Sequence, residues 1–260
     1  MVRLIGFSLA IMISAVIRLA AQQPDTLPID TDRPDFTDGV HTLPRGYFQL
    51  ETGYTVQQGR GTDATESQSF PEMLIRIGVA SRAELRIGQN YLVEGSNGPG
   101  AQSSRGFDDL YVGTKVGPVE ERGIRPAISF ELQLRIPSGS TAVSGNVDRR
   151  LLPGGAILLG WETSGPWSAG VEFFGTRTAD THGQGVASLS VQYQVAARAQ
   201  LYAECFTMQP INAGPGAEDY VNSGILVVLS RVTQIDARVG LGLNQAADRY
   251  FVGLGFAVRH

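Results

Sequence analysis

The chain has 260 residues, with 21 basic and 25 acidic side chains and a formal net charge of −4 at pH 7. No stretch is strongly basic, which excludes the usual electrostatic footprint of a nucleic-acid-binding protein. Cys205 is the only cysteine, which excludes an internal disulfide and also the lipid-modified cysteine that follows the cleavage site of a lipoprotein.

Residues 1–21 are typical of a secretory signal peptide. A short basic start ends at Arg3, an apolar run spans Leu4 to Ile17, and the small residues Ala20 and Ala21 follow. The alternative, a membrane-spanning helix, needs about 20 apolar residues, and this run is shorter. We therefore expect this segment to be cleaved. Loss of its two arginines leaves 19 basic against 25 acidic residues, a net charge near −6.

Residues 22–45 form an acidic, proline-interrupted leader strip. The sequence TDRPDFTDG begins at Thr31 and places Arg33 among several aspartates. Pro34 disfavours a helix or a central strand here. An aspartate cluster also suggests calcium, but this spacing matches no EF-hand loop, so we expect no metal site.

Period-2 alternation of apolar and polar residues dominates residues 46–260 and is typical of β-strands. In the first segment Phe48 and Leu50 share one face, whereas Gln49 and Glu51 share the other. Nothing in this part resembles a linker, so we expect one all-β domain. About twelve strands are expected, in the segments 48–57, 72–79, 83–88, 109–116, 128–136, 155–162, 167–176, 185–195, 200–207, 220–229, 234–243 and 249–258.

The predicted connections alternate between short and long. Such alternation is typical of an up-and-down barrel that crosses a membrane with its short turns in the periplasm. An even number of strands then places both chain ends in the periplasm. The predicted short connections are 80–82, 117–123, 163–166, 196–199 and 230–233, and the long ones are 57–69, 94–105, 137–154 and 209–218.

Alternation alone is also compatible with a soluble lipocalin-like barrel or a secreted β-sandwich, whose apolar faces point inward. About eight strands already enclose an interior that side chains fill, so a larger barrel with an apolar interior would be partly empty. The polar faces carry mid-strand charges such as Glu131 and Arg135, and hydrocarbon would penalise each by about 2–4 kcal/mol. We therefore predict a transmembrane antiparallel up-and-down β-barrel with a polar interior.

Four stretches between Thr31 and Gly139 resemble one family: TDRPDFT followed by RGYFQLETGYT, PEMLIRIGVASRAELRIG, DDLYVGTKV and AISFELQLRIPSG. On these stretches the chain is similar to the phenol meta-pathway degradation family of outer-membrane barrels. The resemblance implies a bacterial outer-membrane barrel that passes small, often aromatic, compounds, with outer-membrane lipid and the barrel-assembly machinery as partners. One departure is the ending in Arg259 and His260, where outer-membrane strands usually finish with an aromatic residue.

The leader strip is the first candidate functional segment. In one hypothesis it is a latch that folds into the lumen or its periplasmic mouth and narrows the pore, with Asp32, Arg33, Asp35 and Asp38 as its charged residues. Arg33 is then expected to pair with a luminal carboxylate such as Glu51 or Glu84, and the aspartates with Arg76 or Arg86. The alternative is a mobile tail that only spaces the barrel from the signal peptide.

The charges on the polar strand faces are the second candidate. They would line a polar path that slightly favours cations, because acids outnumber bases. Alternatively they form a paired network that fills the barrel without transport. The predicted lumen-lining residues are Glu51, Glu72, Arg76, Glu84, Arg86, Asp109, Lys115, Glu131, Arg135, Glu172, Glu204, Asp236 and Arg238.

We predict that the protein is not an enzyme; the alternative is a hydrolytic site built from carboxylates alone. The histidines are His41 in the strip, His182 in a predicted turn and His260 at the end, and none lies on a strand beside a serine. Glycine-rich pieces such as GLGLN lack the spacing of a nucleotide-binding loop, so no cofactor is expected. Cys205 falls on an apolar strand face, where we expect a buried, inert thiol.

The sequence therefore predicts an outer-membrane channel or binding pore for small solutes, aromatic or other apolar compounds among them. The alternative is a non-transporting structural barrel whose surface loops make contacts outside the cell. The two functions differ in whether the lumen conducts.

Overall fold

The computed structural model describes residues 28–61, 65–96, 103–180, 182–212 and 216–260. The predicted signal peptide and residues 22–27 of the predicted leader lie outside these residues. The described chain is mostly β-strand, with one short helix, α2 (Thr141–Ser144). No helix in this part of the chain is long and apolar enough to span a membrane.

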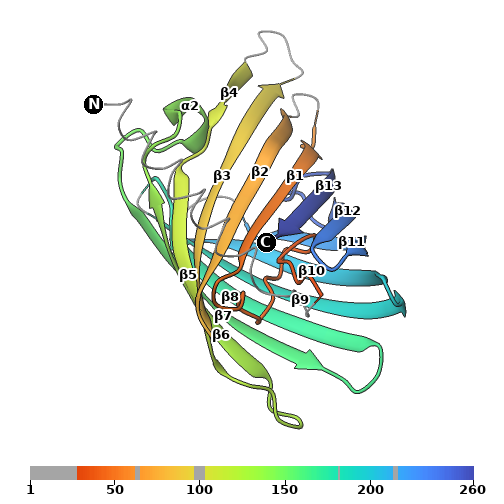
Figure 1. Ribbon diagram of the computed structural model, residues 1–260. Coiled ribbons are helices and arrows are strands. Elements are labelled where there is room, and N and C mark those ends of the chain that lie inside the picture. Colours follow the sequence, from red (N-terminus) through yellow and green to blue (C-terminus); the bar gives the residue numbers. More distant parts are fainter. Residues whose placement is uncertain (1–27, 62–64, 97–102, 181, 213–215) are drawn as a thin grey trace.

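The strands form one antiparallel sheet that closes on itself (Figure 1). They are β1 (Phe48–Gln58), β2 (Thr65–Ala80), β3 (Ala83–Ser96), β4 (Ser103–Phe107), β5 (Leu110–Val119), β6 (Ala127–Ile136), β7 (Leu152–Glu162), β8 (Trp167–Arg177), β9 (Gly183–Ala196), β10 (Ala199–Ile211), β11 (Glu218–Ser230), β12 (Thr233–Gly242) and β13 (Tyr250–Arg259). Pairing of β1 with β13 closes the ring. Both β4 and β5 pair with β3, each along a different part of its length, so together they take the place of one strand. The wall of the barrel is therefore twelve strands around. The predicted fold class is confirmed.

The two ends of the barrel differ in their connections. The turns at 81–82, 197–198 and 231–232 lie at one end, which also holds the start of β1 and the end of β13. There the Phe48 amide donates to the His260 carbonyl at 2.8 Å. We call this the short-turn end. The opposite end, where β1 ends and β2 begins, carries the described connections 137–151 and 243–249, and we call it the long-loop end.

Several strands extend into segments that the sequence predicted as loops. β2 begins inside the predicted loop 57–69, β4 lies mostly inside 94–105, and β10 continues into 209–218. These segments lack a continuous apolar face, but their backbones still pair, as Gln58 does with Glu66. Because the prediction relied on apolar alternation, it ended these strands too early.

Polar side chains face the interior and apolar side chains face outward, as predicted. On β1, Glu51 is 1% exposed, whereas Tyr54 on the other face is 37% exposed. On β13, Leu254 is 60% exposed and Ala257 is fully buried. Cys205 lies on the outer face and is exposed, so the expected burial of this thiol was wrong. The apolar face that carries it faces away from the protein interior.

Candidate functional site in the barrel lumen

Residues 28–45, which we call the luminal strip, precede β1 and fold inside the barrel (Figure 1). The strip contacts side chains from opposite parts of the wall. The Leu43 amide donates to Glu84 on β3 at 2.6 Å, and the Phe36 amide donates to Glu204 on β10 at 2.9 Å. The strip therefore crosses the lumen instead of lying along one side of it.

Asp32 is the buried ionic centre of the strip. Its carboxylate accepts hydrogen bonds from Lys115 at 2.9 and 3.0 Å and from Arg86, and Arg76 lies at 3.4 Å. Burial by itself would raise the pKa of Asp32, but the charges of Arg76, Lys115 and Arg86 outweigh it and hold that pKa well below its usual range. Asp32 is thus an anion that three wall cations hold in place.

Arg76 on β2 connects the wall to two parts of the strip, one before and one after its tip. Its guanidinium donates to Glu84 at 2.9 and 3.0 Å and to Glu51 at 3.1 Å. It also donates to the main-chain carbonyls of Asp30 at 3.3 Å and His41 at 3.1 Å. With Arg76 only 2% exposed, this bonding fixes two strip segments against one wall residue.

Arg33 contacts strands β2 and β12, which flank the closing strands β1 and β13. Its guanidinium lies 3.0 Å from Glu72 and 3.5 Å from Asp236. The expected partners Glu51 and Glu84 bond to Arg76 instead, so the predicted pairing of Arg33 was wrong. A Cβ added at Gly53 or Gly255 would lie 2.4 Å from the Arg33 guanidinium. These wall glycines leave the space that the arginine occupies, a feature that charge spacing in the sequence does not reveal.

The tip of the strip, residues 35–38, is held mainly by Glu204. That carboxylate accepts from the Phe36 amide, from the Thr37 amide at 2.6 Å and from the Thr37 hydroxyl. Asp35 accepts from Ser190 at 2.8 Å and from Gln192 at 3.1 Å. The strip tip therefore places one acidic side chain, Asp35, close to a second one, Glu204.

Two carboxyl groups of the tip have raised pKa values. Burial, followed by the charge of Glu204, raises the pKa of Asp35 to about 7. Burial and the charges of Glu131 and Asp32 raise the pKa of Asp38 well above its usual range, although Asp38 also accepts from Arg86 at 2.8 Å. The tip is therefore more stable in place when these carboxyl groups carry protons.

We expect the docking of the strip tip to weaken as the pH rises from about 4 to about 7. Since docking raises the pKa of Asp35 from 3.8 to about 7, its stabilising effect is complete below the lower value and is lost as Asp35 ionises through the higher one. Hydrogen exchange of the Phe36 and Thr37 amides, corrected for intrinsic rates, measures this docking. Asp35→Asn should reduce the pH dependence, leaving the contribution of Asp38.

Asp180→Asn is the control for that measurement, because Asp180 is an exposed residue in the connection after β8 and its partners are Thr178 and His182. Hydrogen bonds from Thr178 and His182 already lower the pKa of Asp180 to about 2. An Asp35→Asn protein whose tip amides keep the full pH dependence of the unmodified chain would contradict the assignment of that dependence to Asp35.

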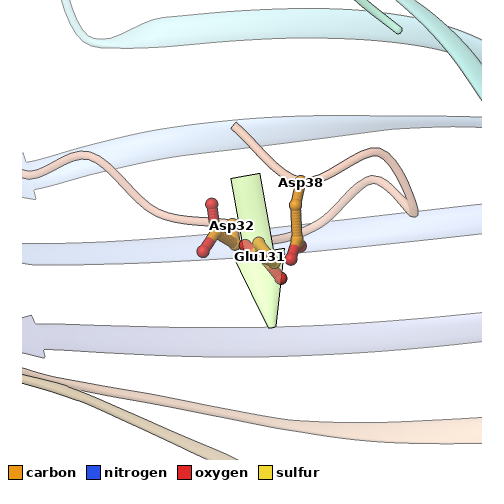
Figure 2. Close-up of side chains that lie close together, drawn as sticks. All are labelled: Asp32, Asp38 and Glu131. Carbon is orange, nitrogen blue, oxygen red and sulfur yellow. The ribbon is translucent and has the colours of Figure 1, made fainter. Parts of the chain in front are cut away.

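Asp32, Asp38 and Glu131 bring three carboxylates together (Figure 2), with oxygen atoms within 4.8 Å of one another. Two cations already contact this group. Arg86 and Lys115 lie 3.1 and 3.2 Å from Glu131, and both also contact Asp32. The arrangement is thus an ion-pair network in which side-chain cations hold the positions that a metal ion would need.

Most of the predicted lumen-lining charges contact the strip or its immediate partners. Arg238 donates to the Pro34 carbonyl at 3.3 Å, and Glu172 accepts from the Asp38 amide at 2.9 Å. Two residues lie apart from this group. Asp109 accepts from Gly139 and Asn146 in the 137–151 connection, and Arg135 is exposed and pairs with Asp108 at 3.3 Å.

An aromatic cluster in the lumen was missed by the sequence analysis. Phe36 of the strip stacks on Phe206 with ring centroids 4.5 Å apart and an interplanar angle of 9°. Phe206 also stacks on Tyr220 at 4.8 Å, and Phe251 completes the buried group. The alternation alone would have predicted the inward position of Phe206, because Phe206 is two residues after the inward-facing Glu204 and lies on the same face of the strand.

A cavity of about 890 Å³ borders the strip. Its lining includes Asp35 and Thr37 of the strip and, at the short-turn end, Arg82 and Glu120. Phe36 is not part of this lining. Space therefore extends from the short-turn end as far as the strip tip, while the Phe36 ring lies on the aromatic cluster.

Comparison with known proteins agrees with this fold. A family model described as “Putative MetA-pathway of phenol degradation” matches residues 31–260. The COG4313 outer membrane channel from Pseudomonas putida F1 superposes with a TM-score of 0.67 at 12% identity, covering 89% of this chain and 100% of that chain. No curated protein matches this sequence.

Two other structures share the barrel. The KdgM porin in complex with disordered oligogalacturonate has a TM-score of 0.53 at 10% identity, covering 81% of this chain and 98% of that chain. The translocator domain of the autotransporter NalP from Neisseria meningitidis has a TM-score of 0.53 at 11% identity, covering 82% and 88%. At these identities the likeness shows a common fold. That fold is one of outer-membrane barrels, in agreement with the predicted location.

Proposed function

Because this chain belongs to the family described as “Putative MetA-pathway of phenol degradation”, we propose that it is an outer-membrane channel for small solutes. In this proposal the luminal strip is a latch that closes the lumen. The residues that hold it in place are Asp32, Arg33, Asp35 and Asp38. The predicted lumen-lining charges bind the latch when it is closed and line the solute path when it is open.

The observation that carries the proposal is the way the strip is held. Asp32 pairs with wall cations that include Lys115 on β5, and Arg33 pairs with Glu72 on β2 and Asp236 on β12, so ion pairs anchor the strip to several strands. The wall also has glycines where the strip backbone approaches, since a Cβ added at Gly78 would lie 1.9 Å from the Pro44 carbonyl oxygen. A tail that served only as a spacer would need neither feature.

Solute transport is supported by the names of two structural neighbours, an outer membrane channel and a porin. The fold alone does not decide the matter, because an autotransporter domain also has it. The aromatic cluster and the family description favour aromatic or other apolar compounds as solutes. The neighbours named here are not enzymes, which agrees with a protein that has no catalytic role.

The proposal includes an orientation. The short-turn end, with both ends of the barrel domain, faces the periplasm, and the long loops face the outside. Residues 1–21 are the signal peptide, 22–45 the leader with its latch, and 46–260 the barrel. The exposed apolar outer face, including Leu132 and Leu254, contacts outer-membrane lipid, and the barrel-assembly machinery inserts the chain.

Planar-bilayer conductance of the refolded chain, measured with and without residues 22–41, tests the proposal. The deletion removes Asp32, Arg33 and the strip tip, so it is expected to give larger and steadier current steps than the full chain. The full chain should conduct in smaller or briefer steps, because the strip closes the lumen for most of the time.

A heat-modifiability gel run on the same samples shows that both proteins have folded. A folded deletion variant that passes no current would rule out the channel and favour the alternative of a structural barrel. Equal current steps from the two folded proteins would instead preserve the channel and rule out the latch.

A further inference from the structure

The Phe36 ring of the luminal strip packs into a group of aromatic side chains that the barrel wall supplies. Three aromatic residues of the wall, Phe206, Tyr220 and Phe251, come from β10, β11 and β13 and pack together. Phe36 is the fourth ring and the only one in this group that the strip supplies. Its nearly parallel stack on Phe206, 4.5 Å between centroids, is the arrangement that a planar ligand ring would adopt.

The same pair of strands holds the strip by two separate means. Glu204 and Phe206 are two residues apart on the inward face of β10, and their register partners on β11 are Asn222 and Tyr220. The first pair is polar, and its carboxylate accepts the strip amides. The second pair is aromatic and takes the ring. A solute could therefore replace the ring contact without first replacing the polar ones.

The ring of Phe36 does not border the cavity. Phe36 is only partly buried and does not line the 890 Å³ cavity that its neighbours Asp35 and Thr37 border. Tyr220 and Phe251 lie within three residues of the long-loop ends of β11 and β13. The aromatic group therefore lies nearer the long-loop end than Glu204 does. Ala247 of the 243–249 connection packs on it and is 1% exposed, so a solute from that end passes this connection and then the rings before it reaches the charged part of the strip.

We propose that Phe36 is a built-in occupant of an aromatic-ring site on Phe206, and that a neutral aromatic solute displaces it and so loosens the latch. This inference rests on the proposed channel function. A neutral ring is favoured over an aromatic carboxylate because Glu204 and Asp35 are acidic and adjacent to the site. A ring hydroxyl would suit the site, since Glu204 is an acceptor once the strip amides have left it.

Phenol binding to the refolded full chain tests this inference, with cyclohexanol as the non-aromatic match and benzoate as the charged one. Calorimetry of the folded protein in detergent is expected to rank phenol above both. Phe36→Ala removes the competing ring and should bind phenol about tenfold more tightly than the unmodified chain. Phe206→Ala removes the site, so adding it to Phe36→Ala should abolish that gain.

The control is Phe70→Ala, because Phe70 is an outward-facing aromatic residue, 61% exposed, whose loss should leave phenol binding unchanged. Phe36→Leu and Phe206→Leu repeat the comparison with smaller packing defects if the alanine variants fold poorly. The inference would be overturned if the Phe36 and Phe206 substitutions changed the affinity for phenol equally, or if the protein bound phenol no more tightly than cyclohexanol. The current steps of the strip deletion are recorded without phenol, so the proposed channel stands or falls separately.

Discussion

Replacing Arg76 with alanine is expected to lower the free energy of unfolding by about 3–5 kcal/mol, the usual loss when one partner of a buried ion pair is removed. Arg76 is 2% exposed and bonds to Glu51 and Glu84, which are 1% and 0% exposed. Without the guanidinium, both carboxylates remain buried with less compensation. Equilibrium unfolding of the refolded chain by guanidinium chloride in detergent measures the change.

Arg82→Ala is the matched control, because Arg82 forms an ion pair with Glu120 in which both side chains are at least half exposed. Such pairs contribute about 0–1 kcal/mol. Adding Glu84→Gln to Arg76→Ala should recover part of the loss, since it removes one of the uncompensated charges. Losses of equal size for Arg76→Ala and Arg82→Ala would show that the luminal network does not stabilise the barrel.

The fold could be predicted because alternation is a local property of the sequence. The assignment of Glu51 to the interior and Tyr54 to the exterior needed only their positions along one strand. Strand ends were less predictable where polar residues pair through their backbones, as Thr65 does with Ser96. The alternation also did not predict that two strands, β4 and β5, pair with successive parts of β3.

The strip was less predictable because its contacts join residues far apart in the sequence. That the strip aspartates meet Arg86 follows from charge, but charge could not choose between Glu51 and Glu72 for Arg33. The choice depends on Gly53 and Gly255, whose missing side chains make room for the guanidinium. Phe36 could not be predicted as part of the site, because a single aromatic residue in an acidic segment has no periodicity.

Glu204→Ala is expected to release the strip tip and to raise the open fraction of the channel about tenfold to a hundredfold, given about 1–3 kcal/mol for leaving buried donors unpaired. Glu204 accepts from the Phe36 and Thr37 amides and is 4% exposed. Single-channel recording gives the open fraction, and hydrogen exchange of the tip amides gives docking independently of current.

Glu172→Ala is the matched control, since Glu172 is also a buried luminal carboxylate, 6% exposed, but accepts from only one strip amide, that of Asp38. Its effect on the open fraction should be clearly smaller. Equal open fractions for the two variants would mean that the tip is held by the ion pairs of Asp32 and Arg33 and not by Glu204.

Glu204→Gln separates hydrogen bonding from charge at the same position. The amide keeps an acceptor oxygen for the strip, so docking should be weakened less than by Glu204→Ala. It also removes the charge that, after burial, raises the pKa of Asp35, so the pH dependence of tip exchange should decrease. Retention of the full pH dependence in Glu204→Gln would mean that burial alone keeps Asp35 protonated, and that Glu204 acts on the strip only through its hydrogen bonds.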